Sequence, residues 1–138
     1  MNKWFFYPLT FTVLLTSTAS AESVYMSPTD SVGNRQYNQQ SYKTQGDRIV
    51  PTDNVGNRQY GKQSYKIQGD RIIPTDDMGN TQYDKSGYRV EANGHMVETD
   101  SVGNRKYNNH DFKMQGNKII PVDSVGNRDY KRSGYVAK

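Results

Sequence analysis

The chain repeats one sequence unit five times, and this repetition limits its fold more than any other feature. Successive units begin 23, 23, 24 and 23 residues apart. Each unit keeps an Asp in its third place, then a Gly-Asn pair, a tyrosine and a second aromatic residue. A fixed period of this length is typical of stacked or circularly arranged supersecondary units. The units cover residues 28–50, 51–73, 74–97, 98–120 and 121–138.

Each unit has the pattern of a β-hairpin. The segment SYKIQ alternates in character, so Tyr65 and Ile67 share one face of a strand. The Gly-Asp pair that follows is a two-residue turn of the kind that hairpins favour. It places Ile67 opposite Ile72 and Tyr65 opposite Pro74, which makes one face aromatic and aliphatic. We therefore expect the second aromatic series to form the core: Tyr42, Tyr65, Tyr88, Phe112 and Tyr135.

The third unit contains one extra residue, and its position tests the hairpin prediction. If residues 92–94 form a three-residue loop, Glu91 still faces His95 and Val90 still faces Met96. The insertion then falls in the turn and leaves the pairing register unchanged, as strand pairing requires.

The D-x-x-G-N motif predicts a second, wider turn in every unit. Its Asp can accept hydrogen bonds from backbone N–H groups, and its Gly or Asn can adopt positive φ. We expect this turn to lead into a short strand at residues 57–60 and its equivalents. Gly and Pro recur often and no 3.6-residue apolar pattern is visible, so we predict an all-β chain without helices.

Both ends of the repeat region fall halfway through a hairpin. Residues 22–27 fit a second hairpin strand, in which Met26 takes the place of Ile49, and residues 133–138 fit a first strand. If these two strands pair, they complete a fifth hairpin and close the sheet into a ring or barrel. Closure removes sheet edges, which are sites of aggregation. The alternative is an open strip with ragged ends.

The first 21 residues have the pattern of a secretory signal peptide. Lys3 precedes an apolar run at residues 4–15, and a small-x-small site ends at Ala21. The run is shorter than a bilayer span requires. We expect cleavage after Ala21, a periplasmic or secreted location, and one domain over residues 22–138. The chain has no cysteine, which excludes disulfides and thiol chemistry.

Four polar residues are specific to the third and fourth units, where an asymmetric catalytic site would appear: Glu91, His95, Glu98 and His110. An alternative interpretation is therefore a small envelope hydrolase or inhibitor. We favour exposed histidines in diverged repeats, because metal-ligand spacing and known catalytic motifs are absent from the sequence. Each unit offers one constant carboxylate, whereas Ca²⁺ takes about six to eight oxygen ligands. We predict no metal, no cofactor and no enzymatic activity.

Basic residues recur in register beside tyrosines, and this pattern is the best candidate for a binding function. Such a ladder could contact an anionic polysaccharide or lipopolysaccharide. A solvated strand face is the simpler explanation of the same pattern. Nucleic acid is not favoured, because the net charge is only +4 and acidic residues are interspersed. The first series is Arg35, Arg58, Arg105 and Arg128, and the second is Lys43, Lys66, Arg89 and Lys113.

The repeated segment TDSVGNRQY resembles the YD repeats of Rhs-type proteins, in its D-x-x-G-N motif, its following tyrosine and its period. The adjoining Tyr-Asp pair of that family occurs here only at Tyr83-Asp84. The resemblance implies a non-catalytic β-hairpin scaffold. We therefore expect an exported, non-enzymatic binding or structural module of the cell envelope. A further alternative is a self-assembling extracellular fibre, with which Gln-, Asn- and Tyr-rich strands are compatible.

Overall fold

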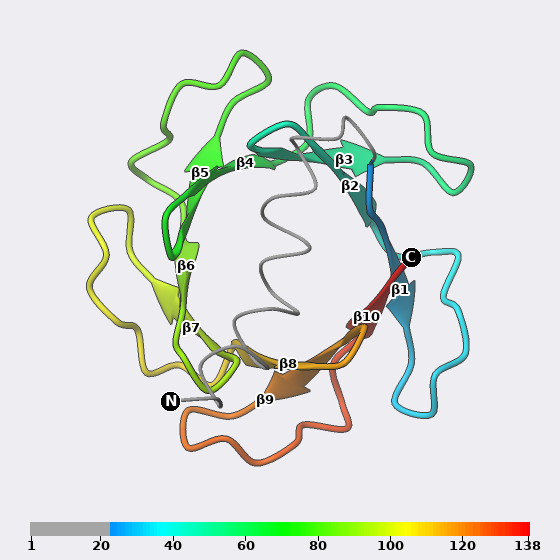
Figure 1. Cartoon of the computed structure of the whole chain (residues 1–138), viewed down its shortest axis with the longest axis vertical. Coiled ribbons are helices and arrows are strands. Elements are labelled where there is room, and N and C mark those ends of the chain that lie inside the picture. The colour runs from blue at the N-terminus through cyan, green and yellow to red at the C-terminus, as the bar shows by residue number, and fades with distance from the viewer. Residues whose placement is uncertain (1–22) are drawn as a thin grey trace.

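A computed structural model of the chain describes residues 23–138 and shows an all-β closed barrel (Figure 1). Ten antiparallel strands pair in chain order, and the predicted signal peptide lies outside the described residues. Residues 23–138 contain no helix. This part of the chain therefore has no helix that could span a membrane. The strands are β1 (Tyr25–Thr29), β2 (Ser41–Gln45), β3 (Arg48–Thr52), β4 (Ser64–Gln68), β5 (Arg71–Thr75), β6 (Gly87–Val90), β7 (His95–Thr99), β8 (Asp111–Gln115), β9 (Lys118–Val122) and β10 (Gly134–Ala137).

The predicted hairpin register is confirmed. Tyr65 pairs with Pro74 and Ile67 with Ile72 between β4 and β5. In the third unit, Val90 pairs with Met96, and the Glu91 N–H donates to the carbonyl of His95. The extra residue therefore lies in the turn and leaves the alternation of the two strands intact.

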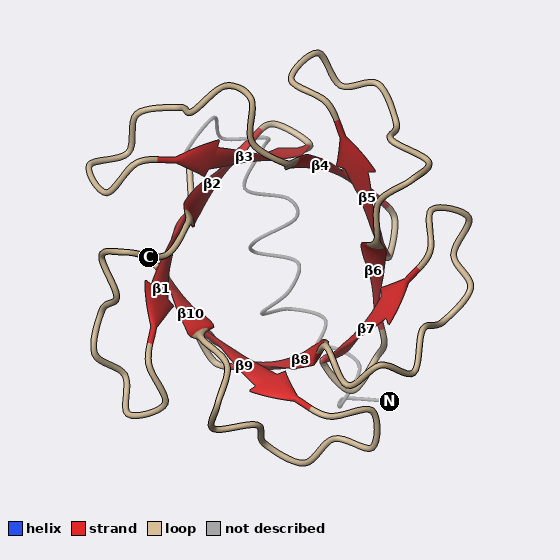
Figure 2. Cartoon of the chain, turned by 180° about the vertical axis from the view of Figure 1, so that it is seen from behind, coloured by secondary structure: helices blue, strands red, loops and turns tan. Residues whose placement is uncertain are grey.

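The two end strands close the barrel, so the open strip is excluded for the described residues. Ser27 of β1 pairs with Val136 of β10, and Met26 pairs with Ala137. The same arrangement is visible from behind, where β1 and β10 lie side by side (Figure 2). Every described strand has two hydrogen-bonded neighbours, so the sheet has no free edge.

The inner face carries the second aromatic series, as predicted, but these rings are only partly buried. They pack against a buried aliphatic cluster that includes Met26, Ile72 and Ile119. The partial exposure arises because a small cavity of about 110 Å³ remains on the inner face among the rings and their aliphatic neighbours. The interior of the barrel is therefore not fully packed. We call the cavity that remains inside it the lumen.

The outer face of the barrel is covered by the long loops that join one hairpin to the next (Figure 1). Val50 and Val97 point outward by register, yet both are 0% exposed. Ile73 is likewise buried on the outer face, although the residues that share this face of the hairpin, such as Lys66 and Arg71, are polar. The loops therefore cover apolar strand residues on the outer face of the sheet, while their own Val and Met side chains stay exposed.

Each D-x-x-G-N loop is an Asp-centred turn. In the second unit the Asp53 Oδ1 accepts from the N–H groups of Val55 at 3.0 Å and Asn57 at 2.9 Å. Gly56 has φ +95°, as the motif predicts. The predicted strand at 57–60 is wrong, because only the single bridge Thr52–Arg58 forms before Tyr60 turns to solvent.

Replacing Gly56 with valine should destabilise the protein by more than about 1 kcal/mol, because a β-branched residue is strained at positive φ. A Cβ atom at this position would also lie 3.1 Å from Cε1 of Tyr25. Gly33 has the same backbone conformation with open space around it, so Gly33→Val isolates the strain. In thermal melts, the melting midpoint of Gly56→Val should be lower than that of Gly33→Val. An unchanged melting midpoint for both would contradict the proposed role of positive φ.

Candidate functional site

The first basic series lies at the junctions between units, with each arginine joined to the loop of the following unit. Arg35 Nη2 donates to the carbonyl of Asn54 at 2.8 Å, and Arg128 Nη2 donates to the carbonyl of Ser31 at 2.6 Å across the closing junction. Thr81 stands in place of the arginine in the third unit. These arginines therefore link neighbouring units of the barrel. Part of their hydrogen-bonding capacity is already used by backbone carbonyl groups.

The same arginines lie over exposed tyrosines. In four units the guanidinium carbon is 4.8–4.9 Å from the centroid of the tyrosine two residues on, within cation–π range. The tyrosines themselves are 66–74% exposed in all five units. Four Arg–Tyr pairs thus project around the outside of the barrel: Arg35–Tyr37, Arg58–Tyr60, Arg105–Tyr107 and Arg128–Tyr130.

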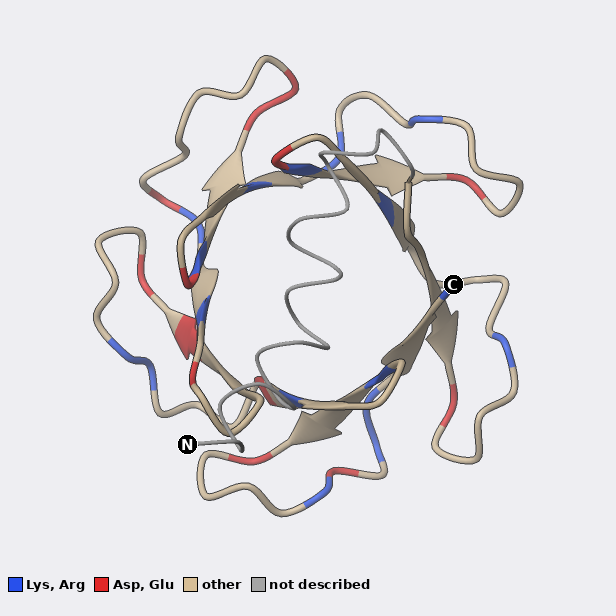
Figure 3. Cartoon of the chain, viewed as in Figure 1, with Lys and Arg blue, Asp and Glu red and all other residues tan. Residues whose placement is uncertain are grey.

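The second basic series lies on the first strands of the hairpins, and the pairing register places it on the outer face. Figure 3 shows the Lys and Arg positions along these strands and the loops. Lys43 Nζ approaches the carbonyl of Gly56 at 3.4 Å, and Arg89 Nη1 donates to the carbonyl of Gly103 at 3.1 Å. Lys66 and Lys113 share the register but make no such bond within residues 23–138. This series is only partly available to a ligand.

The unit-specific histidine His95 belongs to a cluster that the sequence did not predict. Asp111, whose side chain is 0% exposed, accepts from Arg105 Nη2 at 3.0 Å and from the Glu98 N–H at 2.9 Å. His95 Nε2 lies 3.4 Å from the same carboxylate, and its side chain is 15% exposed. The expectation of an exposed His95 is wrong, because its imidazole packs beside the buried Asp111 on the outer face of the barrel. The available signal was an Asp where Ser41 and Ser64 stand in other units.

Glu98 and His110 form a second unit-specific contact. Glu98 occupies the place of the prolines of other units and faces inward beside Tyr88. Its Oε1 is 3.5 Å from Nδ1 of His110, whose side chain is 55% exposed, as expected. Within residues 23–138 the histidines and carboxylates form no group of three that could hold a metal ion. The Asp residues of the loops are also engaged, since hydrogen bonds from backbone N–H groups, that of Asn57 first, lower the pKa of Asp53.

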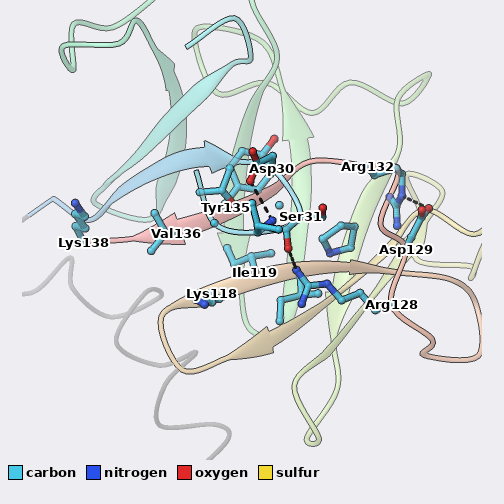
Figure 4. Close-up of a pocket in the computed structure, with 16 residues that line it drawn as sticks. Asp30, Ser31, Lys118, Ile119, Arg128, Asp129, Arg132, Tyr135, Val136 and Lys138 are labelled. Carbon is cyan, nitrogen blue, oxygen red and sulfur yellow. Dashed lines mark hydrogen bonds and ion pairs between the residues drawn. The ribbon is translucent and has the colours of Figure 1, made fainter. Parts of the chain in front are cut away.

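A cleft of about 580 Å³ opens on the outer face where the barrel closes (Figure 4). Ile120 and Val136 contribute apolar surface to it, and Lys118, Arg128 and Lys138 contribute positive charge. Its volume falls in the range of ligand pockets, about 300–1,000 Å³. We name it the closure cleft.

The closure cleft exists because the fifth hairpin departs from the repeat. In the other hairpins a long cation on the first strand pairs with an aliphatic residue, as Lys43 does with Val50. In the closing hairpin Val136 pairs with Ser27, so both side chains are shorter. The volume that a lysine or arginine fills elsewhere is therefore open beneath the loop of the first unit.

Positive charge exceeds negative charge among the side chains that line the closure cleft. Arg132 is paired with Asp129 at 3.0 Å, which neutralises both. Lys118 has neither an ion pair nor a side-chain hydrogen bond within the described part of the chain, whereas Arg71, at the same register position, donates to the carbonyl of Ser101 at 3.1 Å. Lys138 Nζ is likewise unpaired among these residues. Asp30 also lines the cleft, so four cations face two carboxylates, and Lys118 and Lys138 offer free ammonium groups to an anion.

Comparison with protein-family models, with curated proteins and with solved structures gave no match to this chain.

Proposed function

We propose that the protein is a non-enzymatic binding module of the cell envelope that recognises an anionic polysaccharide or a similar polyanion. The observation that carries this proposal is the closure cleft, where unpaired lysines surround a ligand-sized volume. The ten strands leave no free edge through which copies could join, which favours a binding module over a fibre.

The surroundings of the closure cleft suit an extended ligand. Arg128 belongs to the cleft and also stacks on the exposed Tyr130. The loop at residues 29–33, which also lines the cleft, leads to the Arg35–Tyr37 pair. A polymer held in the cleft by its anionic groups would therefore meet Arg–Tyr pairs on both sides, and further pairs repeat around the barrel. Repeated weak contacts of this kind raise the avidity for a polymer over that for its monomer.

Replacing Lys118 and Lys138 with glutamine should abolish most retention of the protein on a heparin column. The reason is that binding to a polyanion depends on the number of cations that displace its counterions. Retention of the unmodified protein should fall steeply as salt is raised, whereas a neutral dextran column should retain nothing.

The charge-matched control replaces Lys62 and Lys85, which are exposed in the loops of the second and third units, with glutamine. This variant should keep most of its retention. Equal losses in both double variants would show that net charge alone governs binding and would reject the cleft as the site. Replacing Arg35, Arg58, Arg105 and Arg128 together tests the ladder, with thermal melts to detect the loss of their links between units.

A further inference from the structure

The inner face of the barrel carries a closed ring of five aromatic side chains. Neighbouring ring centroids are 5.8–6.4 Å apart around the whole circle. A pentagon with sides of about 6 Å has its corners about 5 Å from its centre, which is inside the roughly 6 Å at which aromatic rings attract cations. The members of this ring are Tyr42, Tyr65, Tyr88, Phe112 and Tyr135.

The aromatic ring encloses part of a small apolar cavity. Each strand contributes one inner-face residue to this lumen, whose volume is about 110 Å³. One water occupies about 30 Å³ in the liquid. The lumen is therefore large enough for a compact group such as an alkylated ammonium, and too small for a sugar ring with its substituents.

One carboxylate breaks the apolar pattern beside the ring. Glu98 replaces a proline of the repeat, is 7% exposed and faces inward opposite Tyr88. Its Oε1 is buried and accepts no hydrogen bond. Burial first, and the Glu98 charge next, raise the pKa of Tyr88, which agrees with a carboxylate close to the phenol. A buried charge without a hydrogen-bonding partner is costly unless a ligand compensates it.

Two other charged or titratable groups lie near the aromatic ring, and only His110 is placed to compensate the Glu98 charge. Arg132 lies over the Phe112 ring at 5.1 Å, but its Nε donates to Asp129 Oδ2 at 3.0 Å, so that pair is neutral. His110 is 3.5 Å from Glu98 and neutralises it only when the imidazole is protonated. With a neutral His110, one net negative charge therefore lies behind the aromatic wall, next to Tyr88, although Glu98 itself does not line the lumen.

We propose that the lumen binds the head of an alkylated ammonium compound, which contacts the aromatic ring and is attracted by the charge of Glu98 beside it. This site is separate from the closure cleft, because it lies on the inner face of the sheet and has the opposite charge. It does not depend on the proposed polyanion function, since the two sites share only wall residues such as Tyr135 and Ile119.

The methionines allow a direct test by NMR of protein labelled with ¹³C at the methionine methyl groups. Met26 and Met96 line the lumen, whereas Met78 is 84% exposed on a loop. Titration with choline should shift the resonances of Met26 and Met96 and leave that of Met78 unchanged. The neutral isostere 3,3-dimethylbutan-1-ol, which has the same shape without the charge, should shift them only at much higher concentration.

Glu98→Gln should weaken choline binding at least about tenfold, because the isosteric neutral amide no longer attracts the buried cation. Asp84→Asn is the matched control, since Asp84 is exposed on a loop and should leave binding unchanged. Tyr65→Phe keeps an aromatic ring and verifies that the barrel still folds and binds. Equal affinity for choline and its neutral isostere would overturn the proposal, as would unchanged choline binding in a folded Glu98→Gln variant. Heparin retention should be the same in all three variants.

Discussion

Deleting residues 134–138 should unfold the barrel cooperatively and cause it to oligomerise or aggregate. β10 pairs with β1 on one side and β9 on the other, so its loss exposes two strand edges at once. The deletion also removes Tyr135 from the aromatic ring, where it contacts Tyr42 and Phe112. Loss of a core aromatic side chain alone costs about 3–5 kcal/mol, which is a large part of the stability of a small domain.

The measurement is a thermal melt combined with size-exclusion chromatography. Val136→Lys is a suitable control, because it changes β10 only on the outer face and introduces the residue type found at Lys43. That variant should keep its melting midpoint and its elution volume. If the truncated chain behaves like the control, the end strands do not support the rest of the sheet, and stability is instead a sum over neighbouring units.

Tyr65→Ala should cost roughly 3 kcal/mol or more, as large-to-small aromatic substitutions in cores do. Tyr65 contacts Tyr42 and Tyr88, each at a centroid distance of 6.4 Å, so its removal opens the ring and enlarges the lumen. Tyr65→Phe should be close to neutral, because Phe112 already occupies the equivalent place in the fourth unit.

Tyr60→Ala provides the matched comparison in chemical denaturation experiments. Tyr60 lies five residues before Tyr65 and is 71% exposed, so its loss should cost no more than about 1 kcal/mol, the value of its cation–π contact with Arg58. Equal costs for Tyr60→Ala and Tyr65→Ala would mean that the two aromatic series do not differ in structural role.

The hairpins and their closure could be predicted because both depend on pairing register. The alternation of SYKIQ and the length of its turn determine which residue faces Tyr65, and the same rule applied to the ends pairs Met26 with the last strand. The inner face followed from that register. The partial exposure of the inner-face aromatic rings could not be predicted in this way. The number of strands around a barrel sets the width of its interior, and the alternation within one hairpin does not encode that width.

The side-chain links between units could not be predicted from the repeat. The sequence places Arg35 and Arg128 in one register, but only the folded loops show that their guanidinium groups meet backbone carbonyls of the next unit. Asp111 was missed for a related reason, since its partners His95 and Arg105 come from different segments. The closure cleft was missed because it arises where the fifth hairpin has Val136 in place of the lysine or arginine of the other hairpins. A repeat pattern draws attention to the residues that recur and not to such a replacement.

The link from Arg128 to Ser31 has a kinetic consequence. The equivalent link from Arg105 to Ser124 spans 19 residues, whereas this one spans 97. Loop-closure entropy grows with the logarithm of length, so the longer loop costs only about 1.4 kcal/mol more. Contacts so distant in sequence nevertheless form slowly, and topologies dominated by them fold in milliseconds to seconds. Four hairpins can therefore assemble from local contacts, and the joining of the first and last strands becomes the late step that converts a growing strip into a barrel.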